Sequence, residues 1–192
     1  MQTPTNVSTN AAVTMNRIEF NNSTDSYAVS GLGSVNLAST TDPSPVTPTM
    51  SVTGTHKFQA TVNLLSDTTI NVASGSQLVF DGAFDLGGNT LTKTGGGTVA
   101  INNKLTTGTG GGVDIQQGTV SGDGTIGGDV TNSGGTTAPG NSPGTLTVDG
   151  NYNQGSGGTL AIQIGGIQPG VEHDVLNVLG DASLAGTLDV SL

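Results

Sequence analysis

One short unit recurs along the chain and limits the folds open to it: two apolar residues separated by a single residue, often after a Gly-Thr pair. Side chains alternate between the two faces of a strand, so this spacing over three to five residues predicts short, half-buried β-strands. Helical spacing is nowhere sustained, and glycine is too frequent for stable helices. The unit with its Gly-Thr pair occupies residues 97–101, 144–148, 158–162 and 186–190, and the alternation alone occurs at Val62/Leu64, Ile70/Val72, Leu78/Phe80, Phe84/Leu86, Val113/Ile115 and Leu176/Val178.

Composition separates the architectures that many short strands could build. The 192 residues are 32% hydrophobic, and the four Phe and two Tyr are too few to fill a sandwich core about 10 Å thick. A β-solenoid needs fewer bulky side chains, because small aliphatic side chains fill the thin core of each coil and the coils stack about 4.8 Å apart. Its corners require positive φ angles, which the 32 glycines supply without steric cost. Strand pairs recur at steps of roughly seven and fourteen residues, which predicts an all-β solenoid with about eight or nine coils of about 20 residues.

The glycine-rich stretch from Ser121 to Gln154 has the composition of a flexible linker. The same corner-plus-strand unit nevertheless continues into and through it, at 118–120, 124–126 and 128–130. We therefore expect compact coils here, with Val120, Ile126 and Val130 pointing inward.

Several segments resemble the passenger repeats of autotransporter-type surface proteins, a pattern also found in large exported bacterial proteins with a C-terminal sorting segment. They are "GTVSGDGTIGGDVTNSGGTTAPGNSPGTLTVDGNYNQGSGGTLAIQIGG", which begins at Gly118, and "HDVLNVLGDASLAGTLDVSL", which begins at His173. The stretch "LTKTGGGTVAIN", from Leu91 to Asn102, is similar to the autotransporter-associated β-strand repeat. The resemblance covers residues 62–192, and "APGNSPGTLTV" is its most specific part.

This resemblance implies a right-handed parallel β-helix that is exported to the cell surface or the extracellular space. It implies a non-enzymatic structural role as a stalk, an adhesin or a surface-layer or fibre subunit, without catalytic, cofactor-binding or metal-binding residues. Partners would be further coils of the same protein or a second copy, with surface glycans as a further option. The chain departs from the family pattern in reaching Leu192 within a strand pattern.

Residues 1–60 are less regular than the rest. Strand patterns occur in "VTMNRIEF" and "GSVNLA", whereas three prolines fall between Pro43 and Pro48. Because proline removes a ladder donor, we expect this segment to form a loop that projects from the coils, with partner binding as its functional alternative. The sequence thus predicts irregular N-terminal coils over 1–60 and regular coils over 61–192.

Charge and apolar run length exclude several partners. A formal net charge of −10 with only four basic residues argues against nucleic acid and anionic membrane surfaces. No window approaches 18 consecutive apolar residues, so no membrane-inserting segment is expected. The N-terminus lacks the basic and apolar regions of a signal peptide, so we expect any export signal to lie outside this sequence.

Candidate catalytic residues are few. His173 beside Asp174 could suggest an acid/base pair, but adjacent strand residues face opposite sides, so we expect an exposed polar corner. His56 lies in the alternating "THKFQA" and is expected on the strand surface. An enzyme acting on acidic polysaccharides needs a cation beside clustered carboxylates, and the sole Arg17 is remote in sequence from the Asp-rich coils.

The sequence gives only weak support to a phosphate-binding loop and to a calcium site. Residues 108–114, "GTGGGVD", echo a phosphate-binding loop but lack the following Gly-Lys-Ser/Thr, so a sharp corner is expected. Calcium accepts carboxylates and corner carbonyls, although the G-G-x-G-x-D repeat is absent. The carboxylates considered for calcium are Asp81, Asp85, Asp114, Asp123, Asp129 and Asp149.

Two binding functions stay open as alternatives to a purely structural role. A carbohydrate- or receptor-binding β-helix, as in tailspike-like adhesins, would display an aromatic row, but Phe20, Tyr27, Phe58 and Tyr152 are dispersed. Ice binding would need Thr-x-Thr pairs in every coil, and pairs such as Thr90/Thr92, Thr92/Thr94 and Thr145/Thr147 do not recur in that way.

The C-terminal segment "GTLDVSL" predicts a self-association edge. Leu188, Val190 and Leu192 alternate without a Pro, Lys or Gly that would blunt a free strand. We expect this edge either to continue into further coils or to pair with the N-terminal edge of another subunit.

Overall fold

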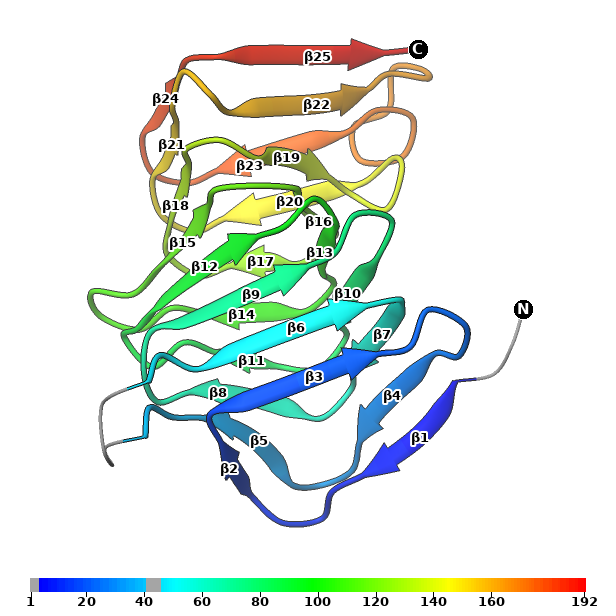
Figure 1. The fold of residues 1–192 in the computed structure, drawn as a ribbon. Coiled ribbons are helices and arrows are strands. Elements are labelled where there is room, and N and C mark those ends of the chain that lie inside the picture. Colours follow the sequence, from blue (N-terminus) through cyan, green and yellow to red (C-terminus); the bar gives the residue numbers. More distant parts are fainter. Residues whose placement is uncertain (1–3, 41–45) are drawn as a thin grey trace.

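A computed structural model describes residues 4–40 and 46–192, and within these ranges it contains 25 β-strands and no helix. The strands form three parallel sheets, which the chain visits in turn, A then B then C, as it winds around one axis (Figure 1). The sheets contain nine, eight and eight strands. The prediction of a parallel β-helix is therefore confirmed.

The strand bounds follow the order of the sheets. Sheet A consists of β1 (Thr5–Ser8), β4 (Tyr27–Ser30), β7 (Thr55–Phe58), β10 (Gln77–Phe80), β13 (Thr98–Ile101), β16 (Thr119–Gly122), β19 (Thr136–Pro139), β22 (Thr159–Gln163) and β25 (Thr187–Ser191). Sheet B consists of β2 (Val13–Met15), β5 (Ser34–Leu37), β8 (Thr61–Leu64), β11 (Phe84–Asp85), β14 (Lys104–Thr106), β17 (Thr125–Ile126), β20 (Thr145–Val148) and β23 (Val175–Val178). Sheet C consists of β3 (Arg17–Asn21), β6 (Thr49–Thr53), β9 (Thr68–Val72), β12 (Thr90–Thr94), β15 (Gly112–Ile115), β18 (Asp129–Asn132), β21 (Tyr152–Gln154) and β24 (Ala182–Leu184).

The coil length matches the period expected from the sequence. Thr98 pairs with Thr119 in the next coil, and Thr119 pairs with Thr136 in the one after, so a coil takes about 20 residues. Coils are longer where a loop is inserted, as between Thr159 and its partner Thr187, which are separated by the loop that joins β22 to β23. Insertions therefore extend the corners while the strand register is preserved.

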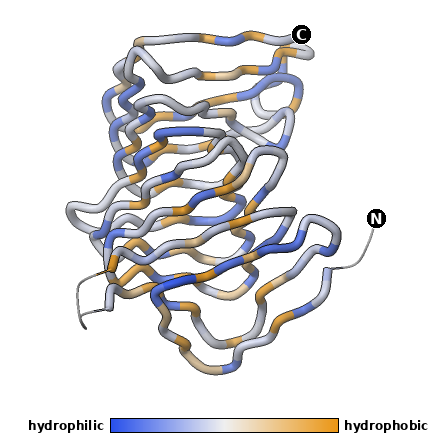
Figure 2. The backbone as a smooth tube through the Cα atoms, in the orientation of Figure 1, coloured by the Kyte–Doolittle hydropathy of each residue, from blue (hydrophilic) through white to orange (hydrophobic). Residues whose placement is uncertain are grey.

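The core is a column of apolar side chains along the axis, and Figure 2 shows apolar and polar residues alternating along many of the strands. Val120, Ile126 and Val130 are buried as predicted, so the glycine-rich stretch forms coils and is no linker. Most aromatic rings lie inside this core. Phe58 stacks on Phe80 with centroids 5.4 Å apart, and Phe80 stacks on Phe84 at 4.3 Å.

The Gly-Thr pairs ahead of sheet A have a steric basis at the corner that leads from sheet C to sheet A. Gly118 has a φ of +68°, and a Cβ there would lie 2.2 Å from the carbonyl oxygen of Gly95 in the preceding coil. Only glycine fits such a position, because the left-handed conformation and the close backbone approach both exclude a side chain. The following residue, Thr119, opens strand β16.

The proline-rich segment is described only at its base. Pro43 and Pro45 lie outside the described residues, whereas Thr40 and Val46 form an antiparallel bridge. Pro48 belongs to the coil and not to the loop, because it is buried and its carbonyl accepts a bond of 3.0 Å from the Thr69 N–H.

Candidate functional site

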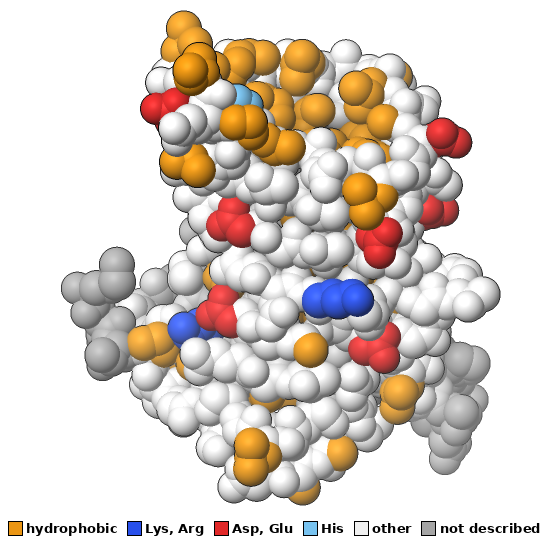
Figure 3. Space-filling view, turned by 180° about the vertical axis from the view of Figure 1, so that it is seen from behind, with side chains coloured by type: hydrophobic (Ala, Val, Ile, Leu, Met, Phe, Trp, Pro, Cys, Tyr) orange, Lys and Arg blue, Asp and Glu red, His pale blue; other side chains and the backbone are white. Residues whose placement is uncertain are grey.

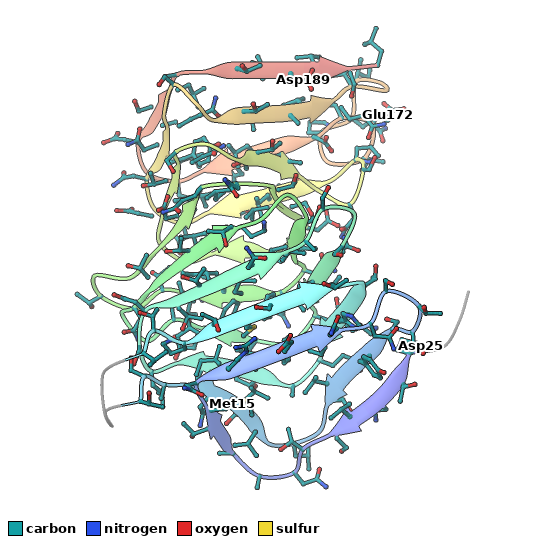
Figure 4. The ribbon with its side chains drawn as sticks, viewed as in Figure 1. Met15, Asp25, Glu172 and Asp189 are labelled. Atoms are coloured by element: carbon teal, nitrogen blue, oxygen red, sulfur yellow. The ribbon has the colours of Figure 1, made fainter. Side chains whose placement is uncertain are left out.

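Both ends of the solenoid carry open apolar surfaces. At the N-terminal end a hollow of about 380 Å³ opens onto the core, between the first strands of all three sheets. Met15, labelled in Figure 4, lies at this end, and Asp189 marks the opposite one. Apolar side chains line the hollow, namely Val7, Val13, Met15, Ile18, Phe20, Val29, Val35 and Phe58.

The C-terminal end exposes the inward side of its last coil. Leu184 is 61% exposed, Leu188 63% and Val190 48%, although the equivalent positions in interior coils are buried. Hydrophobic atoms gather over this end in the space-filling view (Figure 3). The structure places two residues of the predicted edge, Leu188 and Val190, on β25, whereas Leu192 follows the strand and is fully exposed.

Apolar side chains also project from the loop between β22 and β23, next to this end. Ile167 is 90% exposed and Val171 66%. Glu172 stabilises the loop, because its Oε2 accepts hydrogen bonds from the backbone N–H groups of Ile167 at 2.9 Å and Gln168 at 3.0 Å.

His56 was expected on the strand surface, and that expectation is wrong. The ring is fully buried and stacks between Phe20, at 4.7 Å, and Tyr27, at 5.4 Å. Its Nδ1 accepts the Tyr27 N–H at 3.1 Å, while Nε2 donates toward the carbonyls of Thr53 and Asn22 at 2.9 and 3.1 Å. These partners define the tautomer, and the ring links two consecutive coils instead of facing a substrate.

The expectation for Asp174 is also wrong, since the carboxylate is buried and not an exposed corner. It accepts the N–H of Gly144 at 3.0 Å and the N–H of Gln163 at 2.8 Å, one with each oxygen. His173 points elsewhere, with Nδ1 3.1 Å from the carbonyl oxygen of Gly166. The two residues are therefore separate loop contacts and form no acid/base pair.

Sequence reasoning missed three further polar side chains that point into the core from sheet C. Lys93 donates from Nζ to the carbonyls of Thr94, Gly95 and Gln117 at 2.7, 2.8 and 3.0 Å. Asn132 donates to the Thr159 carbonyl at 3.1 Å, and Gln154 donates to the Thr187 carbonyl at 3.1 Å.

These side chains share one role. In each case at least one acceptor belongs to the next coil, so the polar end of the side chain hydrogen-bonds its own coil to the corner of the coil stacked on it. They lie in one register column of inward positions, made of Ile18, Met50, Ile70, Lys93, Ile115, Asn132, Gln154 and Leu184. We call Lys93, Asn132 and Gln154 the corner pegs.

The structure brings no metal site together from the candidate aspartates. Within residues 4–40 and 46–192 no group of three His, Asp or Glu side chains is placed to hold an ion. Asp129 instead accepts the Asn151 N–H, and Asp85 accepts the Thr106 hydroxyl at 2.7 Å. Arg17 pairs with Glu19 at 3.0 Å on the surface. Residues 108–111 form the predicted corner, with positive φ at Gly108 and Gly110, and residues 112–114 already belong to β15.

A shallow groove of about 410 Å³ follows the outer face of sheet A. Its floor includes Thr98, Thr119, Ser121 and Ala161. Single threonines stack in register on this face over five successive coils, at Thr98, Thr119, Thr136, Thr159 and Thr187. The neighbouring column on the same face holds Ala100, which is buried, and then Ser121, Ala138, Ala161 and Asp189, so Thr-x-Thr pairs do not recur on this face.

Comparisons of the chain with protein families, with curated proteins and with solved structures found no match. The part of the chain that the structure describes contains no helix long and apolar enough to cross a membrane.

Proposed function

We propose that this chain is a non-enzymatic structural β-solenoid of an exported bacterial surface protein, of the stalk, adhesin or extracellular-fibre kind. The observation that carries the proposal is the uniform stack of coils in three parallel sheets. Three parallel sheets run the length of the molecule, and both terminal coils expose inward apolar side chains that interior coils bury. Such a surface is stabilised by another coil of the same kind, which extends the stack by about 4.8 Å.

The side faces support this role. Their outward positions in sheet A are mostly threonine, alanine and serine, which suit a smooth rod and offer no charged cluster for a substrate. The net charge of −10 keeps such rods from associating laterally. The resemblance to autotransporter passenger repeats supports a location at the cell surface or outside the cell, with further coils or a second copy of the chain as the proposed partner.

Light scattering over a concentration series tests the proposal. We expect the apparent mass to rise with concentration, because each contact between two copies covers one exposed apolar end coil of each. A strict monomer at millimolar concentration would contradict the structural role.

The groove on sheet A supports a second candidate, binding of a neutral glycan. Its hydroxyl groups are suitable donors and acceptors, but sugar sites usually add an exposed aromatic ring. Five of the six aromatic side chains are buried, and the sixth, Tyr27, packs against His56. We therefore expect no binding on a glycan array, and a specific hit would favour this candidate over the structural role.

A further inference from the structure

Three Asp-Gly steps occur in the chain, at residues 81–82, 123–124 and 149–150. An aspartate before glycine is open to rearrangement of the main chain, because glycine has no side chain to obstruct attack of its nitrogen on the carboxyl carbon. The attack needs an amide nitrogen without a hydrogen-bond partner and a carboxyl group that can rotate toward it. Hydrogen bonds to either group therefore slow the reaction, and the three steps differ in these bonds.

The first step, Asp81-Gly82, is held at both groups. The Gly82 N–H donates to the Phe58 carbonyl of the preceding coil at 3.0 Å. The Asp81 carboxylate accepts the side-chain amide of Asn102 at 3.0 Å and lies 3.5 Å from the Lys57 ammonium. The nitrogen and the carboxyl group of this step are thus both engaged with other residues.

The second step, Asp123-Gly124, is held in the same way. The Gly124 N–H donates to the Ile101 carbonyl at 2.9 Å. The two carboxylate oxygens of Asp123 are both used, one by the side-chain amide of Asn141 at 2.6 Å and one by the Thr145 N–H at 3.2 Å. Rotation of this carboxylate toward its own glycine would break both bonds.

The third step, Asp149-Gly150, lies at the corner between β20 and β21 and is held at neither group. Asp149 is exposed, and its own N–H donates to the Ile126 carbonyl at 2.7 Å. Within residues 4–40 and 46–192, no protein group accepts the Gly150 N–H, and none bonds to or pairs with the Asp149 carboxylate. Rotation about bonds of Asp149 alone therefore brings the two groups together.

We propose that Asp149-Gly150 is a site of spontaneous main-chain modification, at which aspartate converts to β-aspartate. The Gly150 nitrogen bonds to the carboxyl carbon of Asp149, and the hydroxyl of the protonated carboxyl group leaves as water with the amide proton. Water then adds to the former main-chain carbonyl carbon of the resulting succinimide, and the bond from that carbon to the Gly150 nitrogen breaks. The side-chain and main-chain carboxyl groups have then exchanged roles, with no net change in mass.

The modification would disturb contacts between stacked coils, because β-aspartate adds one methylene to the main chain at a tightly packed corner. The Gly150 carbonyl accepts the Gly180 N–H at 3.0 Å, and the Asn151 N–H donates to the Asp129 carboxylate at 2.8 Å. A Cβ at Gly150 would lie 2.5 Å from the carbonyl carbon of Gly128, so the corner has little room to adjust. We therefore expect the bond to Gly180 to weaken after modification.

The two held steps are internal controls for the test, which does not depend on the proposed structural function. The folded protein is kept for weeks at neutral pH, digested, and its peptides are analysed by electron-transfer mass spectrometry, which distinguishes β-aspartate from aspartate. We expect at least about tenfold more β-aspartate at Asp149 than at Asp81 or Asp123, since about 1.4 kcal/mol for releasing the bonds of a held step slows its reaction by that factor. The chain unfolded in urea should modify all three steps to similar extents.

Equal modification of the three steps in the folded protein would overturn the proposal. It would also be overturned if the folded protein left Asp149 unmodified while the unfolded chain modified it.

Two matched variants give an independent readout. Asp149→Asn should form the same succinimide faster, with loss of ammonia, whereas Asp81→Asn should stay largely unchanged because the Gly82 N–H remains held. Asp149→Glu keeps the charge but would have to close a larger ring, so it should not rearrange. Hydrogen exchange at the Gly180 amide should accelerate in the aged wild type and not in aged Asp149→Glu. Equal deamidation of the two Asn variants would contradict the proposed selectivity.

Discussion

Lys93 is an ammonium held inside the solenoid without a carboxylate beside it. Its side chain is 1% exposed, and three backbone carbonyls surround Nζ. Burial lowers the pKa of Lys93 from 10.5 to about 8, because the charged form loses its hydration. The ammonium group thus donates hydrogen bonds to the corner after β12 and to the next coil, while burial disfavours its charged form.

The stability of the protein should therefore depend on pH through Lys93. Between pH 8 and pH 10.5 the unfolded chain binds this proton and the folded chain has released it, so stability rises with pH in this window. The full effect is about 3 kcal/mol. Urea unfolding of the wild type and of Lys93→Met across this pH window measures the contribution of Lys93 to the free energy of unfolding. A difference between the two proteins that does not change with pH, or that shifts against the wild type as the pH rises, would contradict the lowered pKa of Lys93.

A substitution of Gln154 tests how much the corner pegs contribute to stability, without a change in charge. Gln154→Leu keeps the volume but leaves the carbonyl oxygens of Ala185 and Thr187 without this donor. We expect a loss of about 1–3 kcal/mol in the free energy of unfolding. The adjacent outward residue provides the matched control, since Asn153→Leu should change stability by less than about 0.5 kcal/mol.

The alternation that predicts the apolar core also points to the pegs. Lys93 follows Leu91, Asn132 follows Val130 and Gln154 follows Tyr152, each at the next position but one and thus on the same inward face. Local pattern gives the direction of these side chains, and the same rule places His56 beside Phe58. It does not give their partners, because the acceptors in the next coil lie 24 to 33 residues away.

At the scale of elements, strands could be predicted and loops could not. A strand is defined by period-two spacing within a few residues, whereas the loop between β22 and β23 depends on contacts with another corner. Asp174 joins the end of β22 to Gly144, which lies 30 residues away. No local signal marks such a carboxylate as buried, and it was expected in water.

Asp174→Ala should consequently destabilise the loop. The N–H groups of Gly144 and Gln163 lose their acceptor, which costs about 1–3 kcal/mol. Hydrogen exchange at these two amides should accelerate, with Asp149→Ala as the control on an exposed turn. Unchanged exchange would mean that the loop is held by its other bonds alone.

At the scale of the whole molecule, the proposed structural role predicts that isolated copies associate through exposed apolar coils. Val190→Lys places a charge at an inward position of β25 and should reduce such association strongly, because an ammonium buried between stacked coils would have no partner. Thr187→Lys adds the same charge on the outer face of the same strand and should leave assembly nearly unchanged. Equal effects of the two variants in light scattering would indicate simple charge repulsion.

Electron microscopy of the unmodified chain at high concentration tests the proposed structural role most directly. We expect filaments in which successive coils are spaced by about 4.8 Å along the axis, as they are within the solenoid. Protein that forms no filaments and stays monomeric at millimolar concentration would contradict the structural function itself.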